Sequence, residues 1–134
     1  MIVDAGVLYS STDAADPDHA SAVDTLTGWE GELVVPAFVA AEADYLILSR
    51  LGVAAQLAFV DDLSAAYHVE GLDAAGLRRA AEVCRQYRDL ELGLADASVV
   101  VLADSWSTHA LATFDRRHFR AVTALDGEPF ELFP

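Results

Sequence analysis

Short uninterrupted apolar runs alternate along the chain with longer stretches in which apolar residues recur at helical spacing. Three runs, at Ile2–Val3, Leu33–Val35 and Ala110–Phe114, are typical of strands that are buried on both faces. Two further strands are predicted at Tyr67–Glu70 and near Phe130–Phe133. Because helical stretches separate the strands, the order predicts right-handed βαβ units and a mainly parallel sheet of four to five strands.

Helical spacing and terminal residues predict the segments that connect these strands. Asp16 followed by Pro17 is expected to begin a helix, with Asp16 as its N-cap, and Asp73 is expected to cap another. Pro36 is expected to begin a helix that Gly52 ends. The expected helices cover residues 6–11, 17–28, 36–51, 53–65, 74–87, 94–106 and 116–119. The whole pattern predicts one domain, residues 1–134, folded as a three-layer α/β/α sandwich.

Composition supports a single globular domain and excludes several functions. The chain has 134 residues, 54% of them hydrophobic, and a net charge of -14. All 8 basic residues are arginines, so phosphotransfer by a P-loop lysine and Schiff-base chemistry are excluded. The acidity also argues against nucleic-acid binding by bulk charge alone. The single cysteine, Cys84, has no partner in the chain for a disulfide. No apolar run approaches the length of a membrane span, and a soluble cytoplasmic protein is therefore expected.

Four acidic residues from separate segments are placed where a ligand site is expected, beyond the carboxyl ends of parallel strands. Asp4 ends the first strand, and Asp115 follows the strand at Ala110–Phe114. Asp96 lies in the first turn of an apolar helix, and Glu42 is expected to point inward from another. Oxygen-only ligands suit Mg²⁺ or Mn²⁺. Helix capping, turn formation and pairing of Glu42 with an arginine remain alternative roles for these acids.

The order of these segments resembles the PIN domain, and most closely the toxin ribonucleases of VapBC-type toxin–antitoxin pairs. Each matching motif is short, but the four occur in the right order and the resemblance spans essentially the whole chain. The segment from Thr113 to Phe119 is the most specific, because it is similar to a T-x-D-x-x-F ending of the family. The matching pieces are Met1-Ile-Val-Asp4 with Val7-Leu8, Val35-Pro36 followed by Glu42, Leu94-Ala-Asp96-Ala97, and Thr113-Phe-Asp115-Arg-Arg-His-Phe119.

The resemblance implies a PIN-like fold and an endoribonuclease that uses Mg²⁺ or Mn²⁺. By position, Asp4, Glu42, Asp96 and Asp115 match the catalytic metal-binding carboxylates, and Thr113 matches a hydroxyl residue that supports the site. The resemblance further implies an RNA substrate, a homodimer and a cognate antitoxin that holds the toxin inactive. Apolar residues on more than one face of the stretches after Pro36 and Val53 agree with a protein partner, and Trp29 and Trp106 are interpreted as core or dimer contacts.

Two local features bear on how RNA would be bound and cut. Arg116, Arg117 and Arg120 lie beside Asp115 and are candidate RNA-binding residues, although pairing with nearby acids is the alternative. His118, in the same segment, is expected to make a local hydrogen bond rather than to act as a general base. The family usually has a hydroxyl or amide side chain just after the first aspartate, where this chain has Gly6, unless Ser10 or Ser11 substitutes.

Other functional classes are less consistent with the residues. A catalytically weak or inactive PIN-like scaffold is the main alternative, and Gly6 is its best support. A phosphatase of the haloacid-dehalogenase type needs a second aspartate at the position of Gly6, and it also uses a lysine that this chain lacks. A phosphoacceptor receiver domain is excluded because it needs paired N-terminal acids and a lysine.

Overall fold

A computed structural model describes all residues 1–134 and contains a five-stranded sheet in which every neighbouring pair of strands is parallel. The strand order is β3-β2-β1-β4-β5, so the first strand lies at the centre of the sheet. The strands are β1 (Ile2–Val3), β2 (Val34–Pro36), β3 (His68–Glu70), β4 (Ala110–Ala112) and β5 (Glu131–Phe133). All five lie within or next to the predicted segments, and the predicted parallel sheet is confirmed.

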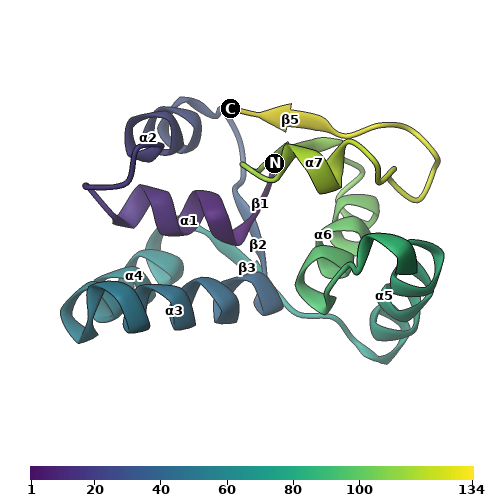
Figure 1. The fold of residues 1–134 in the computed structure, drawn as a ribbon, viewed down its shortest axis with the longest axis horizontal. Helices are drawn as coiled ribbons and strands as arrows, with labels where there is room; N and C mark the ends of the chain where they lie inside the picture. The colour runs from purple at the N-terminus through teal and green to yellow at the C-terminus, as the bar shows by residue number, and fades with distance from the viewer.

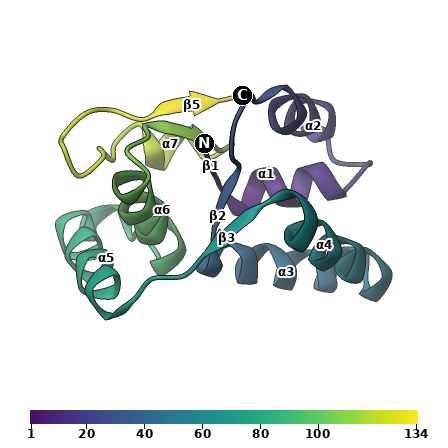
Figure 2. The same ribbon diagram turned by 180° about the vertical axis from the view of Figure 1, so that it is seen from behind.

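Helices cover the sheet on both sides, which confirms the α/β/α sandwich. Figure 1 and the reverse view in Figure 2 show α1 to α4 on one side of strands β1 to β3, and α5 and α6 on the other. The helices are α1 (Ala5–Thr12), α2 (His19–Gly28), α3 (Ala37–Leu51), α4 (Val53–Ala66), α5 (Ala74–Gln86), α6 (Leu94–Ser105) and α7 (Arg116–Phe119), with a 3-10 turn at Arg88–Leu90. No helix is both long and apolar enough to cross a membrane.

Of the four helix boundaries predicted from single residues, those at Asp73 and Gly52 are confirmed, and α3 begins at Ala37, directly after Pro36. The Asp73 side chain accepts a hydrogen bond from Gly76 N at 2.7 Å and so caps α5, and Gly52 ends α3 with a φ of +87°. The predicted start of α2 at Asp16–Pro17 is wrong, because α2 begins at His19. The Asp16 carboxylate instead accepts from Asp18 N at 2.8 Å, which closes a turn before the helix.

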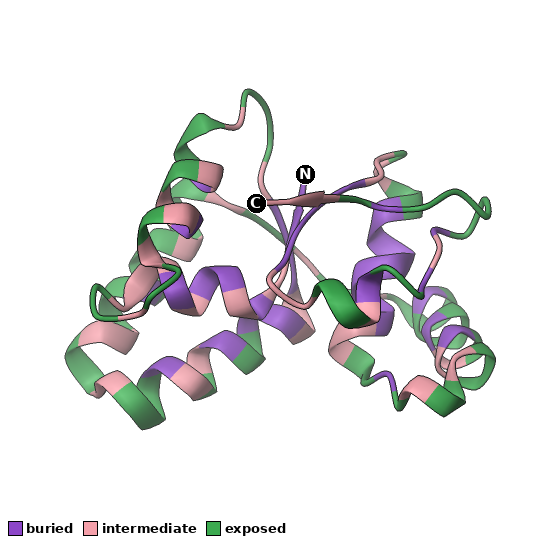
Figure 3. Ribbon diagram, turned by 45° about the horizontal axis from the view of Figure 1, so that its top comes forward, coloured by how far each residue is buried: buried purple, intermediate pink, exposed green.

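The most deeply buried helix is α6, in which every residue from Ala97 to Ala103 is buried. Figure 3 shows α6 and the central strands as the main buried elements. The helix packs against α5, α3 and the first two strands, so its position relative to the sheet is fixed by close packing. As a result the first turn of α6, which carries Asp96, is held near the carboxyl end of β1.

Candidate active site

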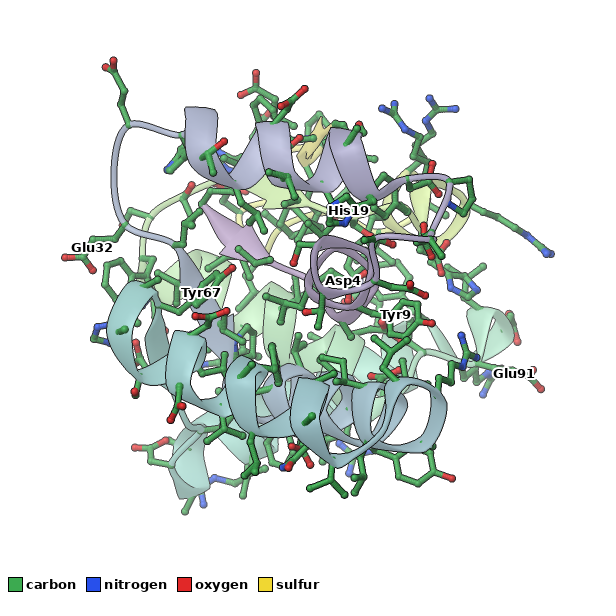
Figure 4. The ribbon with its side chains drawn as sticks, turned by 90° about the vertical axis from the view of Figure 1, so that its left-hand side faces the viewer. Asp4, Tyr9, His19, Glu32, Tyr67 and Glu91 are labelled. Carbon is green, nitrogen blue, oxygen red and sulfur yellow. The ribbon has the colours of Figure 1, made fainter.

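Asp4 stands at the carboxyl end of the central strand and begins the next helix. Its backbone N–H donates to Ala112 O on β4 at 3.0 Å, which ties the strand end to its neighbour. Its carboxylate caps α1 by accepting from Ala5 N at 2.7 Å through Oδ1. Figure 4 shows Asp4 at the start of α1, which is seen end-on in this view. Two neighbouring elements therefore fix the position of this carboxylate.

Thr113 joins two of the predicted acids through one hydroxyl group. The residue is fully buried, and its Oγ1 donates to Asp4 Oδ2 at 2.7 Å while accepting from Asp115 N at 3.0 Å. The hydroxyl thus orients the Asp4 carboxylate and at the same time fixes the backbone that carries Asp115. This geometry agrees with the supporting role that the resemblance implies for Thr113.

Asp115 lies beyond the end of β4 and caps the short helix α7. Its Oδ1 accepts from His118 N at 3.0 Å, and its Oδ2 lies 2.7 Å from His118 Nδ1. The local hydrogen bond expected of His118 is therefore present. Helix capping does not exclude a ligand role, because a carboxylate oxygen has more than one lone pair.

Asp96 is in the first turn of α6, where its Oδ2 accepts from Gly93 N at 3.1 Å. Sequence reasoning did not identify this contact, although a glycine three residues before an acid at a helix start is a recognisable signal. The hydrogen bond anchors one oxygen and leaves the other free for a ligand. Asp96 is partly buried, which places its charge in a medium that solvates it poorly.

The ionised forms of three of these acids are destabilised in the fold. The pKa of Asp4 is raised to about 6, mainly by burial and in addition by the negative charges of Asp96 and Glu42, while the hydrogen bonds from Thr113 and Ala5 oppose the rise. Burial likewise raises the pKa of Asp96, to which the charge of Asp115 adds. The pKa of Glu42 is raised by partial burial and by Asp96. Asp96 thus lies within electrostatic range of the other three carboxylates.

The expectation that Glu42 points inward is wrong. The buried face of α3 consists of Val39, Ala40, Ala43 and Ile47, whereas Glu42 is exposed. Tyr45, three residues after Glu42 on the same helix, is 70% exposed. Glu42 consequently has access to solvent, and no arginine pairs with it. The alternative role of Glu42 as one half of a buried ion pair is therefore not observed.

The donor chemistry of this group fits a hard divalent cation. All four side chains offer carboxylate oxygens, and bound positive charge would relieve the repulsion that adds to burial in raising the pKa values of Asp4, Glu42 and Asp96. In this structure no three acidic, histidine or cysteine side chains are gathered closely enough to ligate one ion. Closure around an ion therefore requires rotation of side chains, for which the exposed Glu42 has freedom.

No side chain replaces the missing hydroxyl or amide at Gly6. The Ser11 hydroxyl donates to Leu8 O at 2.8 Å within α1, so it is not directed at Asp4. The side chain of Ser10 is buried and makes no hydrogen bond to Asp4. A Cβ atom added at Gly6 would meet no atom within 4 Å, so the position is open.

The three arginines that follow Asp115 remain free of acidic partners. Arg116, Arg117 and Arg120 are exposed, and none of them takes part in an ion pair. The alternative in which these arginines pair with nearby acids is therefore not observed. Their guanidinium groups remain available to an external anion.

Comparison with known proteins identifies the fold and the family. The crystal structure of the toxin VapC20 from Mycobacterium tuberculosis, which cleaves the sarcin–ricin loop, superposes with a TM-score of 0.79 at 22% identity, covering 86% of this chain and 89% of the other. VapBC2 from Rickettsia felis, bound to a DNA fragment from its promoter, superposes with a TM-score of 0.72 at 11% identity, covering 99% and 98%. At these identities the likeness shows the fold alone.

Sequence similarity extends over the full chain. Ribonuclease VapC26 from Mycobacterium tuberculosis (strain ATCC 25618 / H37Rv) is 40% identical over 135 residues, which is 100% of both chains. The family model of the PIN domain matches residues 1–125, a range that includes all four candidate acids and the arginines beside Asp115. The chain therefore belongs to the PIN domain family.

Proposed function

We propose that this protein is a metal-dependent endoribonuclease and the toxin of a type II toxin–antitoxin pair. The observation that carries this proposal is the full-length similarity to a ribonuclease, at 40% identity. The acids at the carboxyl edge of the sheet supply the chemistry that such an activity needs. The solved structures that share this fold include a protein described as a toxin, VapC20 from Mycobacterium tuberculosis.

Asp4, Glu42, Asp96 and Asp115 are the residues that would hold one or two Mg²⁺ or Mn²⁺ ions. When bound, such an ion supplies Lewis-acid activation of water and stabilises negative charge on the phosphodiester. Thr113 contributes by fixing the rotamer of Asp4 through a 2.7 Å hydrogen bond. Because the same hydroxyl fixes the Asp115 backbone, it sets the separation of two of the ligands.

Arg116, Arg117 and Arg120 are proposed to bind RNA phosphates next to the carboxylates. They are exposed, unpaired and placed within five residues of Asp115 in the chain. Guanidinium groups bind phosphate oxygens in a bidentate manner, which positions the backbone without reading the base. A chain of charge -14 needs such a local cationic rim, because its overall field repels RNA.

A homodimer and an antitoxin are the proposed protein partners. Five large apolar side chains are exposed on α3 and α4, and a protein partner that covered them would remove their apolar surface from water. They are Tyr45 (70% exposed), Leu48 (42%), Val53 (62%), Leu57 (58%) and Val60 (43%). Exposed apolar side chains concentrated on two adjacent helices are typical of a protein interface. Purification alone and together with the protein of the neighbouring reading frame, with masses measured by light scattering, tests both partners.

Cleavage of RNA in the presence of Mg²⁺ or Mn²⁺ tests the activity directly. Asp4→Asn and Asp96→Asn keep the shape of each side chain and remove its charge, and each is expected to reduce cleavage at least a hundredfold. Asp61→Asn, an exposed acid on α4, is the matched control and is expected to cleave at the wild-type rate. Cleavage that survives in both active-site variants would show that these carboxylates are not the metal ligands.

A catalytically inactive scaffold is the second candidate. The observation that favours it is the absence of a closed group of ligands in this structure, together with the glycine that follows Asp4 and Ala5. Isothermal titration with Mn²⁺ separates the two functions. The nuclease is expected to show a binding site that is lost in Asp4→Asn, whereas a scaffold shows no such site.

A further inference from the structure

A hollow lies at the opposite edge of the sheet from the candidate active site. Its volume is about 370 Å³, which is within the range of small-molecule sites. Two tryptophans and two glutamates are among the residues that line it: Trp29, Trp106, Glu30 and Glu32. The remaining lining comes from Met1, Gly31, Val34 and Thr108.

The position of this hollow follows from the parallel sheet. Met1, Glu32 and Thr108 come shortly before β1, β2 and β4, so they lie at the amino ends of the strands. The candidate catalytic acids follow the strands and therefore lie at the carboxyl ends. Figure 4 shows Glu32 at the outer edge of the molecule, away from Asp4 and on the side opposite Glu91. The two sites share no residue.

Both indole rings are held in place by other side chains. Trp106 Nε1 donates to Glu70 Oε2 at 2.7 Å, and its ring lies 4.9 Å from the His68 ring in an edge-to-face arrangement. The Trp29 ring makes a similar contact with Phe133 at 5.5 Å. Because the rings are fixed before any ligand arrives, binding between them loses little side-chain entropy.

The charges around the hollow are predominantly negative. Glu30 and Glu32 are exposed, and neither is paired with an arginine. Glu32 has only a distant contact with His68 Nδ1, at 4.0 Å. The Met1 ammonium is the one positive group in the lining, and it donates to the backbone carbonyl of Glu32 at 2.9 Å rather than to a carboxylate. The Glu30 carboxylate therefore has no ion-pair partner, and that of Glu32 has only the nearby charges of Met1 and, at 4.0 Å, of His68 when protonated.

We propose that this hollow binds a guanidinium group. Aromatic rings attract cations, and the indole ring does so most strongly. Guanidinium is favoured over ammonium because it is planar and weakly hydrated, stacks on aromatic rings, and binds carboxylates through two parallel hydrogen bonds. The two sources of such a group are a free small molecule and an arginine side chain of a basic protein segment.

Intrinsic tryptophan fluorescence measures occupancy without any assay of activity. The chain has only 2 tryptophans, and both line the hollow, so the whole signal comes from this region. Titration with N-acetyl-arginine amide is expected to change the emission in a saturable manner, whereas N-acetyl-citrulline amide, which has no charge, is expected to leave it unchanged. Equal responses to the two compounds, or no response to either, would overturn the proposal.

Variants locate the binding within the molecule. Glu30→Gln and Glu32→Gln are each expected to weaken binding about threefold, as for loss of one partly exposed ion pair. Glu82→Gln removes an exposed acid on α5 and is the matched control, with unchanged affinity expected. Since all three positions are exposed, folding is preserved. Equal weakening by Glu82→Gln would show that the general negative charge, and not this hollow, is responsible.

Two further probes complete the assignment. N-acetyl-lysine amide is expected to bind several times more weakly than the arginine compound, and equal affinity would refute the guanidinium assignment. N-propylguanidine, which carries the same single charge without an amide backbone, distinguishes the sources. Tighter binding of N-propylguanidine assigns the hollow to a free small molecule, and tighter binding of N-acetyl-arginine amide assigns it to an arginine of a protein segment.

Discussion

Replacement of Asp4 by asparagine is expected to stabilise the fold at neutral pH while it abolishes RNA cleavage. The carboxylate lies at the end of a buried strand, next to the charges of Asp96 and Glu42, and its pKa is raised from 3.8 to about 6. Its ionised form is therefore less stable in the fold than in the unfolded chain. Asparagine has the same shape and no charge, so the variant avoids this cost.

The magnitude follows from the pKa values and the hydrogen bonds. A rise from 3.8 to about 6 corresponds to about 3 kcal/mol of destabilisation at pH values above both. Asparagine retains one acceptor oxygen, so one of the hydrogen bonds from Ala5 and Thr113 is weakened, at a cost of about 1 kcal/mol. The net stabilisation expected for Asp4→Asn is about 2 kcal/mol, or about 8 °C in Tm for a chain of this length.

The advantage of the variant depends on pH in a defined direction. Between pH 3.8 and about 6 the folded protein keeps a proton on Asp4 that the unfolded chain has already lost. Wild-type stability therefore falls relative to the variant as the pH rises through this window. The part of the difference that comes from ionisation of Asp4 is complete above about pH 6 and disappears below pH 3.8.

Urea unfolding in the presence of a chelator, repeated from pH 3.5 to 8, measures this difference. Asp61→Asn is the control, because it removes one charge from an exposed position on α4. Added Mg²⁺ is expected to stabilise the wild type and to have less effect on Asp4→Asn, since an ion that binds only the folded protein raises its stability. An Asp4→Asn variant that is less stable than the wild type at pH 8 would refute the reasoning.

Three other substitutions test particular contacts. Thr113→Val removes the hydroxyl between Asp4 and Asp115. It is expected to lower the free energy of unfolding in urea by about 2 kcal/mol and to reduce kcat for RNA cleavage at least tenfold. An unchanged kcat would contradict the role of Thr113 in positioning Asp4. Gly6→Ser places a hydroxyl in open space. It is expected to stabilise the fold by about 0.5 kcal/mol and to speed RNA cleavage. Slower cleavage would argue against a positioning role for a hydroxyl at residue 6. Asp73→Ala removes the cap of α5 and is expected to lower the free energy of unfolding by about 1 kcal/mol. An unchanged free energy of unfolding would show that the cap does not contribute to stability.

The fold could be predicted from sequence because its strands are buried on both faces. Such strands consist of unbroken apolar runs, and the helix caps at Asp73 and Gly52 use residue types with strong local preferences. The start of α2 was misplaced because Asp16, Asp18 and Pro17 all carry start signals. The hydrogen bond from the Asp18 N–H to the Asp16 carboxylate makes Asp16 the residue that closes the turn, and composition does not determine this contact.

The orientation of Glu42 could not be predicted for a different reason. Apolar residues occur around most of the circumference of α3, so their periodicity does not select one inward face. The face that the core covers carries the small side chains of Ala40 and Ala43, which allow close packing, while the larger Tyr45 remains outside. Helix packing, rather than the number of apolar residues, decides which face is buried.

The position of three unpaired arginines, rather than their lack of partners, is the informative part of the charge distribution. Of the 8 arginines only Arg79 and Arg88 form an ion pair, Arg79 with Asp104 at 2.8 Å. Arg116, Arg117 and Arg120 are the unpaired arginines that follow shortly after Asp115, whose charge adds to the raised pKa of Asp96. In the proposed function the acids would hold the cations and the arginines would hold the phosphates. Because the acid surplus elsewhere would repel RNA at long range, the proposal predicts that productive binding depends on this short cationic segment and on bound metal.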